Sequence, residues 1–373
     1  MTYVKQLILG ILALTVLGGG LNLLIDPFDI FGTPQVERLN TRKSLGSDRL
    51  TKPLQAVVRR PETIILGTSR CLHGLDPKDA PGRKVYNLSV PGALADELAA
   101  LSRHVATATT AHRLILCLDF VSFNDARSQR AGFYDEVLGP WGLWRSVPRT
   151  VFSYAALKRS RNTLRDSLRG KPNRYRSDGF RPFEPRDKNG GMITPVASFL
   201  SPGGAYRDFP GTQAKLAELP PLFKDLRAAG IELTVVVPAI HAVQLEAIAE
   251  AGLWSMFENW KRGLTAACAV AEVHCWDFAG YFPETTENLS PPPRNFGDAS
   301  HFQPSLGQRM LKRIADSSDA PGFGRRLTPV VITDHLRAIR RAQAAYRKAH
   351  KADVAAVHKI AATYGLRPKD QGK

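Results

Sequence analysis

The stretch ETIILGTSRCLHGL, residues 62–75, is the part of the chain from which the fold follows most directly. Its apolar run from Ile64 to Leu66 predicts a short buried strand, and the small residues Gly67-Thr68-Ser69 suit a tight turn from a strand into a helix. Such a turn places the Ser69 hydroxyl above the edge of a sheet. A free hydroxyl is a weak nucleophile at neutral pH unless a histidine and an acid activate it, and the segment Asp298-Ala299-Ser300-His301 offers both.

Outward from this stretch, short apolar runs alternate with helical patterns. The expected strands are residues 63–66, 85–88, 114–120, 231–237 and 272–276, and the expected helices include residues 93–108 and 216–229. Strands that alternate with helices are typical of a parallel sheet wrapped by helices. The sequence therefore predicts an α/β fold, in the form of a three-layer α/β/α sandwich around a central parallel sheet of about five strands.

The chain divides into three expected parts: an N-terminal membrane anchor over residues 1–32, an α/β domain over residues 33–329, and a basic C-terminal helical extension over residues 330–373. Within the domain, residues 126–212 contain Gly, Pro and Arg clusters without sustained periodicity, which indicates an insertion. It follows the third strand, where α/β sheets place their ligand crevice, so we expect it to border the site. The extension is expected to be one long helix, packed on its own domain or facing a membrane or partner.

The N-terminal segment has an apolar run over residues 7–25, about the length needed to cross a bilayer. We interpret it as a signal anchor, because the run is long for a signal peptide; cleavage near Gly18-Gly19-Gly20 and a buried core helix are the alternatives. Lys5 favours a cytoplasmic N-terminus, although Arg42 and Lys43 soon after the run weaken that preference. We expect a single-pass protein of the inner (cytoplasmic) membrane with its globular domain on the periplasmic or extracellular side.

The formal net charge of +17 is concentrated in two segments. Residues 127–212 carry +9 and residues 331–373 carry +7, so the rest of the chain is close to neutral. Neither segment contains a recognisable nucleic-acid-binding module, and we expect no nucleic-acid partner. A basic surface attracts the opposite charge, which favours an acidic polysaccharide or an anionic lipid surface as the partner.

The four cysteines are Cys71, Cys117, Cys268 and Cys275. They show no C-x-x-C spacing, so no zinc site is expected, and the sequence indicates no other metal and no cofactor. An oxidising compartment would permit a disulfide between Cys268 and Cys275. Free buried thiols are the alternative, as the position of Cys117 in the middle of an expected strand illustrates.

Acyl transfer needs a serine, a histidine base, an acid that orients the base, and hydrogen-bond donors for the oxyanion, and the sequence can supply each of them. Ser69 follows the first strand, and the pair Asp298 and His301 lies in a loop that can approach the same edge. Gly92 follows the second strand and Asn124 the third. Together with the backbone N–H of Ser69, these two residues are the expected oxyanion donors.

Each of these residues also has a structural interpretation. Ser69 could cap a helix, Asp298 could cap the helix that begins near Pro304 with His301 on the surface, and Asn124 could stabilise a turn. Two further residues, Arg70 and His241, are candidates for substrate binding. Arg70 meets either an anionic substrate or a neighbouring carboxylate, and His241 has a structural role as its alternative. His73, in the helix after Ser69, is expected to point away from the site.

Taken in order, the blocks Gly67-Thr68-Ser69, residues 87–92, Asn124, and Asp298-x-x-His301 resemble the four-block pattern of the SGNH (GDSL-like) hydrolase superfamily. The N-terminal anchor, Asp26-Pro27-Phe28 and the Gly-Thr-Ser-Arg form of the serine block are similar to its membrane-anchored, exported branch, which includes proteins of alginate O-acetylation and teichoic-acid D-alanylation. The resemblance covers roughly residues 60–315. It implies Ser69 as nucleophile, His301 as base, Asp298 as its orienter, and Gly92 and Asn124 as oxyanion donors. The chain departs from the pattern at Thr68 and in its third block, Ser-Phe-Asn-Asp.

Two functions follow as hypotheses. The first is a membrane-tethered serine esterase or O-acyltransferase that acts on a cell-envelope polysaccharide through an acyl-Ser69 intermediate, with a membrane-bound acyltransferase as a possible donor partner. The second is a non-catalytic scaffold of the same fold that binds an envelope glycan or an assembly partner. The two differ in whether a serine-reactive reagent labels Ser69.

Overall fold

The structure is a computed structural model that describes residues 2–129, 133, 135–183, 191–290, 292–317 and 322–366. Its centre is a six-stranded sheet in the order β2-β1-β3-β4-β5-β8. The strands are β1 (Thr63–Leu66), β2 (Val85–Asn87), β3 (Arg113–Cys117), β4 (Glu232–Val237), β5 (His274–Asp277) and β8 (Arg325–Arg326). The first five pair in parallel, and β8 adds an antiparallel edge. The predicted α/β class with a mostly parallel sheet is therefore confirmed, whereas β8 was not predicted.

Both faces of the sheet are buried, because neighbouring residues of one strand enter two separate hydrophobic clusters. Ile64 and Leu66 of β1 belong to the larger cluster and Ile65 to the smaller. The larger cluster includes residues of α4 (Ala95–Ala108), α9 (Leu219–Ala228), α10 (Ala242–Glu250) and α11 (Trp254–Val270). The smaller one includes residues of α3 (Ser69–Gly74) and α12 (Pro304–Asp316). Since side chains alternate across a strand, continuous apolar runs such as that of β1 fit a strand buried on both sides.

The insertion contains helices that its sequence did not indicate. These are α5 (Gly142–Thr150), α6 (Tyr154–Leu168) and α7 (Thr194–Leu200), preceded by the 3₁₀ turn η3 (Asp135–Val137). The buried positions of α6 are small or polar, namely Ala156, Ser160, Thr163 and Ser167. An apolar stripe is the usual signal of a packed helix, and the buried positions of α5 and α6 lack one, whereas the short α7 buries Val196 and Leu200.

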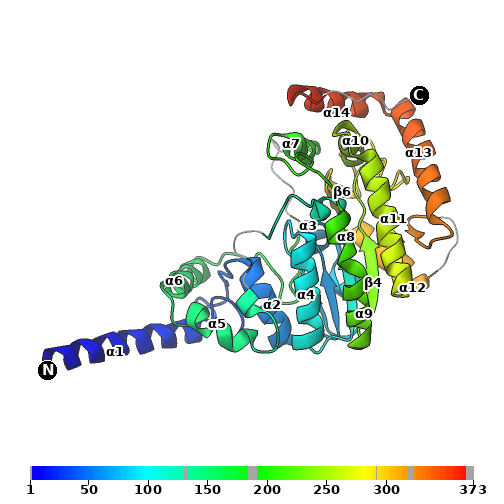
Figure 1. Ribbon diagram of the computed structural model, residues 1–373. Coiled ribbons are helices and arrows are strands. Elements are labelled where there is room, and N and C mark those ends of the chain that lie inside the picture. The colour runs from blue at the N-terminus through cyan, green and yellow to red at the C-terminus, as the bar shows by residue number, and fades with distance from the viewer. Residues whose placement is uncertain are drawn as a thin grey trace.

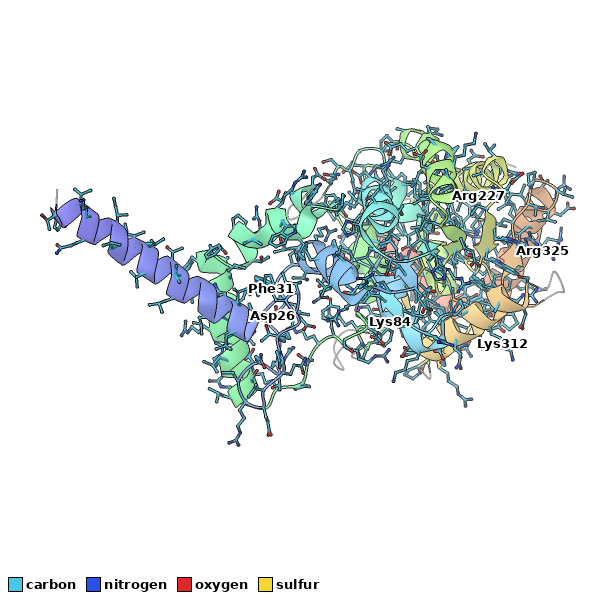
Figure 2. The ribbon with its side chains drawn as sticks, turned by 90° about the horizontal axis from the view of Figure 1, so that it is seen from below. Asp26, Phe31, Lys84, Arg227, Lys312 and Arg325 are labelled. Atoms are coloured by element: carbon cyan, nitrogen blue, oxygen red, sulfur yellow. A yellow bond between two sulfur atoms is a disulfide. The ribbon has the colours of Figure 1, made fainter. Side chains whose placement is uncertain are left out.

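The apolar N-terminal run forms α1 (Thr2–Ile25), a helix long and apolar enough to cross a membrane or to serve as a signal sequence. It projects from the body, and only its C-terminal end packs against the rest of the chain, on α6 (Figure 1). Asp26 follows it with φ of 45°, and the Asp26 carboxylate accepts the N–H groups of Ile30 and Phe31 (Figure 2). These bonds close the turn that connects α1 to the polar segment before α2 (Asp48–Arg59).

The C-terminal extension forms two helices where one long helix was predicted. α13 (Ile332–Ala349) and α14 (Lys351–Thr363) meet at His350 and turn through a corner visible in Figure 1. α14 packs on α10 and α7 and buries Val354, Val357 and Ala361. The remaining elements are α8 (Gln213–Ala217), the 3₁₀ turns η1 (Pro77–Asp79) and η2 (Phe120–Phe123), and a hairpin of β6 (Phe296–Asp298) with β7 (His301–Phe302).

Candidate active site

Ser69 is the first residue of α3 and lies where β1 ends. The turn is tight because Gly67 packs on β3: a Cβ at Gly67 would stand 2.6 Å from the Cβ of Cys117, so no other residue fits without movement. Thr68, and not Ser69, is the N-cap, and the Thr68 hydroxyl accepts the N–H of Arg70. The Ser69 hydroxyl is therefore free of the capping role that was its structural alternative.

The structure brings Ser69, His301 and Asp298 together. Ser69 Oγ lies 2.8 Å from His301 Nε2, and His301 Nδ1 lies 2.9 Å from both carboxylate oxygens of Asp298. With the Nδ1 proton directed at Asp298, Nε2 is in position to accept the proton of the Ser69 hydroxyl. The geometry is that of a nucleophile, a base and an orienting acid within hydrogen-bond reach.

The β6–β7 hairpin holds Asp298 in its ionised form. Asp298 Oδ1 accepts the N–H groups of Ser300 at 2.8 Å and of His301 at 2.9 Å. Burial raises the pKa of Asp298, but the hydrogen bond and charge attraction of the His301 ring, together with these two N–H groups, outweigh it, so the pKa lies below its ordinary value. Gln303, and not Asp298, occupies the N-cap position of α12.

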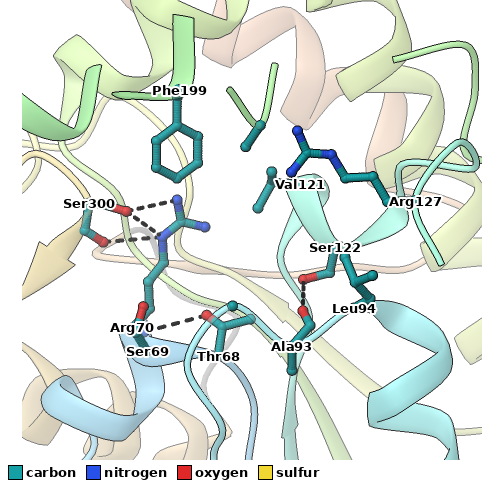
Figure 3. A pocket seen from close by; sticks show the side chains of 12 residues that line it. Thr68, Ser69, Arg70, Ala93, Leu94, Val121, Ser122, Arg127, Phe199 and Ser300 are labelled. Carbon is teal, nitrogen blue, oxygen red and sulfur yellow. Dashed lines mark hydrogen bonds between the residues drawn. The ribbon is translucent and has the colours of Figure 1, made fainter. Parts of the chain in front are cut away.

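Arg70 of α3 connects this helix to the segment after β3 through a buried ion pair and to the β6–β7 hairpin through hydrogen bonds. The Arg70 guanidinium is paired with Asp119, which follows β3, and its Nε donates to the carbonyl of Ser300 at 3.1 Å (Figure 3). Thr68 Oγ1 donates to the same Asp119 carboxylate. Of the two roles left open for Arg70, the structure shows contact with a neighbouring carboxylate. Asp119 was not among the predicted site residues, although an acidic residue just after a buried strand is a signal that could have indicated it.

Ser69 and Gly92 line one pocket, and their backbone N–H groups are candidate donors to an oxyanion. Ser69 is at the start of α3, where N–H groups have no partner within the helix. Gly92 lines the same pocket with φ of 60°, and no hydrogen bond of the described residues uses its N–H. A glycine suits this position because its backbone adopts positive φ without strain.

Asn124, the third expected donor, does not line the pocket. The Asn124 amide donates to the carbonyl of Asp208 at 3.2 Å, and its Oδ1 accepts the N–H of Ala126 at 2.9 Å. The strand β3 is shorter than predicted, and the 3₁₀ turn η2 that follows it directs Ser122 to the pocket and Asn124 into the turn with Asp208. Asn124 therefore has the turn-stabilising role that was its structural alternative, and this corrects its predicted role as an oxyanion donor.

The pocket beside Ser69 is small, with a volume of about 80 Å³. Its walls include Leu94, Val121 and Phe199, the last of which comes from α7 in the insertion (Figure 3). A cavity needs roughly 10–15 Å³ on this measure to hold one water, so the pocket has room for a few heavy atoms. The insertion borders the site, as its position after the third strand predicted.

His73 lies against the site, contrary to the expectation that it points away. Its ring meets the His301 ring edge-on at 5.6 Å and the Phe183 ring at 5.7 Å, and its Nδ1 donates to the carbonyl of Arg181 at 2.9 Å. Burial, and then the nearby His301, lower the pKa of His73 to about 4. A neutral His73 therefore supports one side of the His301 ring near neutral pH.

His241 has a structural role, and the substrate-binding role considered for it is a correction. The residue is buried, its Nδ1 accepts the N–H of Val243 as the N-cap of α10, and its Nε2 donates to the carbonyl of Glu287 at 2.8 Å. Both ring nitrogens are thus in use, and burial lowers the pKa of His241 to about 4.

The lowered pKa of His241 predicts that the protein loses stability in mild acid, because the buried ring resists protonation. A histidine in the unfolded chain binds its proton near pH 6.5, whereas folded His241 resists protonation down to about pH 4, so stability falls as the pH falls through that window. The slope from one such group reaches about 1.4 kcal/mol per pH unit. We expect the free energy of unfolding, measured by denaturant titration in detergent, to fall less steeply with decreasing pH for His241→Asn than for the wild type. Asparagine keeps a capping side chain but does not titrate. Equal slopes would contradict this assignment.

The structure has one disulfide, between Cys71 of α3 and Cys117 of β3. It fastens the helix that carries Ser69 to the neighbouring strand across Gly67. Cys268 and Cys275 are free and buried, so the alternative of buried thiols holds for this pair and the disulfide considered between them is absent. Cys117, expected to illustrate a free thiol, is instead bonded.

A scan against protein-family models and searches of the curated proteins and of the solved structures found no match. The function is therefore inferred from the geometry of the site.

Proposed function

We propose that this protein is a serine esterase or O-acyltransferase of the SGNH type, with the three-layer α/β/α arrangement that this type implies. The observation that carries the proposal is the hydrogen-bonded series from Asp298 through His301 to Ser69 Oγ at the end of β1. Catalytic residues at the carboxyl ends of parallel strands are usual in α/β folds. The buried Asp298 keeps the imidazole in the tautomer that accepts a proton from serine.

The reaction runs in two halves. Ser69 Oγ attacks the ester carbonyl while His301 Nε2 accepts its proton, and the N–H groups of Ser69 and Gly92 receive the charge that develops on the carbonyl oxygen. The ester C–O bond then breaks, and the leaving alcohol takes the proton from His301. In the second half, His301 Nε2 takes a proton from a water or a sugar hydroxyl, whose oxygen attacks the acyl carbonyl carbon. The bond between that carbon and Ser69 Oγ then breaks, and Oγ takes the proton from His301. The size of the pocket favours a short acyl group such as acetyl.

A basic cavity supports an acidic polymer as the acyl acceptor. It has a volume of about 430 Å³ and is lined by six cationic residues and two acidic ones, namely Arg42, Lys43, Arg159, Lys171, Arg174, Arg181, Asp48 and Asp166. The segment that lines this cavity at Arg181 also contacts the site. The carbonyl of Arg181 accepts a hydrogen bond from His73, and the ring of Phe183 contacts the ring of His301. Such a cavity attracts carboxylate or phosphate groups.

Two observations support export to the outer side of the inner (cytoplasmic) membrane. α1 provides a segment of spanning length, and the Cys71–Cys117 disulfide is typical of proteins in an oxidising compartment. A cell-envelope polysaccharide is the corresponding substrate. When the chain acts as a transferase, a membrane-bound acyltransferase is the proposed source of the acyl group.

Covalent labelling of Ser69 tests the proposal. A fluorophosphonate probe is expected to attach to Ser69 in the full chain in detergent, because the probe reacts with serines activated by a neighbouring base. Mass spectrometry of the labelled peptide identifies the site, and His301→Ala is expected to slow labelling strongly. Absence of label in a folded preparation would favour the non-catalytic scaffold.

A further inference from the structure

The helices α5 and α6, with the turn between them, form a hairpin over residues 141–168 whose outward face is unusual for a protein in water. In α5 the inward residues are small or polar, namely Gly142, Ser146 and Thr150. The outward residues Trp141, Trp144, Arg145 and Pro148 recur at helical spacing, and the two tryptophans are 64% and 71% exposed. A helix that packs in water normally turns its aromatic residues inward.

α6 repeats this arrangement. Its inward hydroxyls hold the chain together: Ser160 Oγ donates to Asn22 of α1 at 2.7 Å, and Thr163 Oγ1 accepts the N–H of Ser44 at 3.0 Å. Its outward face carries Tyr154, 81% exposed, together with exposed Leu157, Lys158, Arg161 and Leu168. An outward face that combines aromatic and aliphatic side chains with Lys and Arg is typical of a helix at a membrane interface.

The hairpin contacts α1 inside its apolar run. A Cβ at Gly19 would lie 2.6 Å from the ring of Phe152, which is in the turn between α5 and α6, and Asn22 Nδ2 donates to the carbonyl of Val151 at 2.6 Å. Gly19 precedes Ile25, the last residue of α1, by six positions, which is about 9 Å along a helix. An apolar run over residues 7–25 is about as long as the hydrocarbon core is thick. If that run fills the core, the turn lies about 9 Å inside its boundary, which is within the roughly 5–10 Å to which interfacial helices bury their apolar faces.

We propose that the hairpin is a second membrane-contacting element of this protein and that its outward face lies in the interface of a bilayer containing anionic phospholipid. Trp141, Trp144 and Tyr154 occupy the boundary between headgroups and acyl chains, where amphipathic rings are favoured. Arg145, Lys158 and Arg161, for which the described residues offer no ion-pair partner, meet the lipid phosphates. The inference rests on the membrane anchoring of α1 proposed above and is independent of the ester chemistry.

Attachment to the membrane by both α1 and the hairpin has a consequence that attachment by α1 alone does not have. A single span leaves a domain free to rotate and tilt, whereas α1 and the hairpin, which lie at the same end of the molecule (Figure 1), together fix its orientation on the membrane. The edge of the sheet that carries Ser69 is then held at a constant height above the bilayer.

Tryptophan fluorescence provides the test, because Trp141 and Trp144 are exposed whereas Trp254, Trp260 and Trp276 are buried. The full chain is reconstituted into vesicles of phosphatidylglycerol and phosphatidylethanolamine whose acyl chains carry bromine, a quencher. We expect the brominated lipid to quench the tryptophan emission of the full chain, and we expect this quenching to be lost in Trp141→Phe/Trp144→Phe, whose remaining tryptophans are buried. As a matched control, Val330→Trp in that double variant places the ring at a site 87% exposed just before α13, which lies on the far side of the molecule from α1 (Figure 1), and it should remain unquenched.

Two outcomes would overturn the proposal: a chain that resists alkaline extraction but shows no quenching dependent on Trp141 and Trp144, or a chain that alkaline extraction removes. In the first case a protein partner, and not lipid, is the better occupant of this face. Equal quenching in vesicles of phosphatidylcholine alone would overturn the part of the proposal that requires anionic lipid. Probe labelling of Ser69 in the same samples shows whether the proposed chemistry stands when the hairpin proposal fails.

Discussion

Replacing Ser69 with alanine is expected to lower kcat on a small acetyl ester by a factor on the order of 10⁴ to 10⁶. The reason is that Ser69 Oγ lies 2.8 Å from the Nε2 of His301 as the proposed nucleophile, and without it no acyl-enzyme forms. Removal of one member of a nucleophile–base–acid group costs nearly as much as removal of all three, because the members act as a unit. Steady-state hydrolysis of a chromogenic acetyl ester by the full chain in detergent measures the effect.

A matched serine controls for damage to the fold. Ser102 is buried, and its hydroxyl donates to the carbonyl of Leu98 within α4, away from the pocket. Ser102→Ala should therefore retain turnover close to that of the wild type. If Ser69→Ala and Ser102→Ala retained the same turnover, the mechanism proposed for this site would be wrong, and the scaffold hypothesis would be the better description.

Replacing Asp119 with alanine is expected to lower the free energy of unfolding by about 3–5 kcal/mol. Asp119 and Arg70 are both buried, and the carboxylate also accepts the Thr68 hydroxyl. Without Asp119, a guanidinium remains in the interior without its carboxylate partner, and the hydrogen bonds from its Nε and Nη2 to Ser300 are to neutral groups. Removal of one member of a buried pair is costly because the remaining charge is desolvated without compensation. Denaturant unfolding followed by circular dichroism measures this loss.

An exposed ion pair is the matched control. Asp334 and Arg337 form a pair on α13 in which the side chains are 82% and 68% exposed. Exposed pairs of this kind contribute about 0–1 kcal/mol, so Asp334→Ala should change stability little. A loss for Asp119→Ala no larger than that for Asp334→Ala would show that the buried pair does not hold the nucleophile helix in place.

Much of the fold could be predicted because it depends on local patterns. Residues 63–66 form β1 as predicted, and β2, β4 and β5 lie within about two residues of their expected bounds. The helices of the insertion could not be predicted in the same way. The inward faces of α5 and α6 are small and hydroxylated, and they are stabilised by contacts such as that of Ser160 with Asn22, which is distant in the chain. The corner at His350 likewise depends on the packing of α14 against α10.

By itself the sequence determined that Ser69 lies at the carboxyl edge of the sheet. Ser69 follows an apolar strand, and the carboxyl ends of parallel strands share one edge, so its position there follows from chain direction alone. The pairing of Asp298 with His301 is also local, since three residues separate them.

Tertiary structure alone decided which of these side chains meet. His301 is 232 residues from Ser69, and the distance of 2.8 Å between them depends on how the β6–β7 hairpin docks on α3 through Arg70 and Ser300. The same packing brings His73 against His301, whereas the contact with Asp208 turns Asn124 away from the pocket. A hydrogen bond tolerates errors of only a few tenths of an ångström, and such tolerances are set by the shape of the packed interior, which local propensities do not specify.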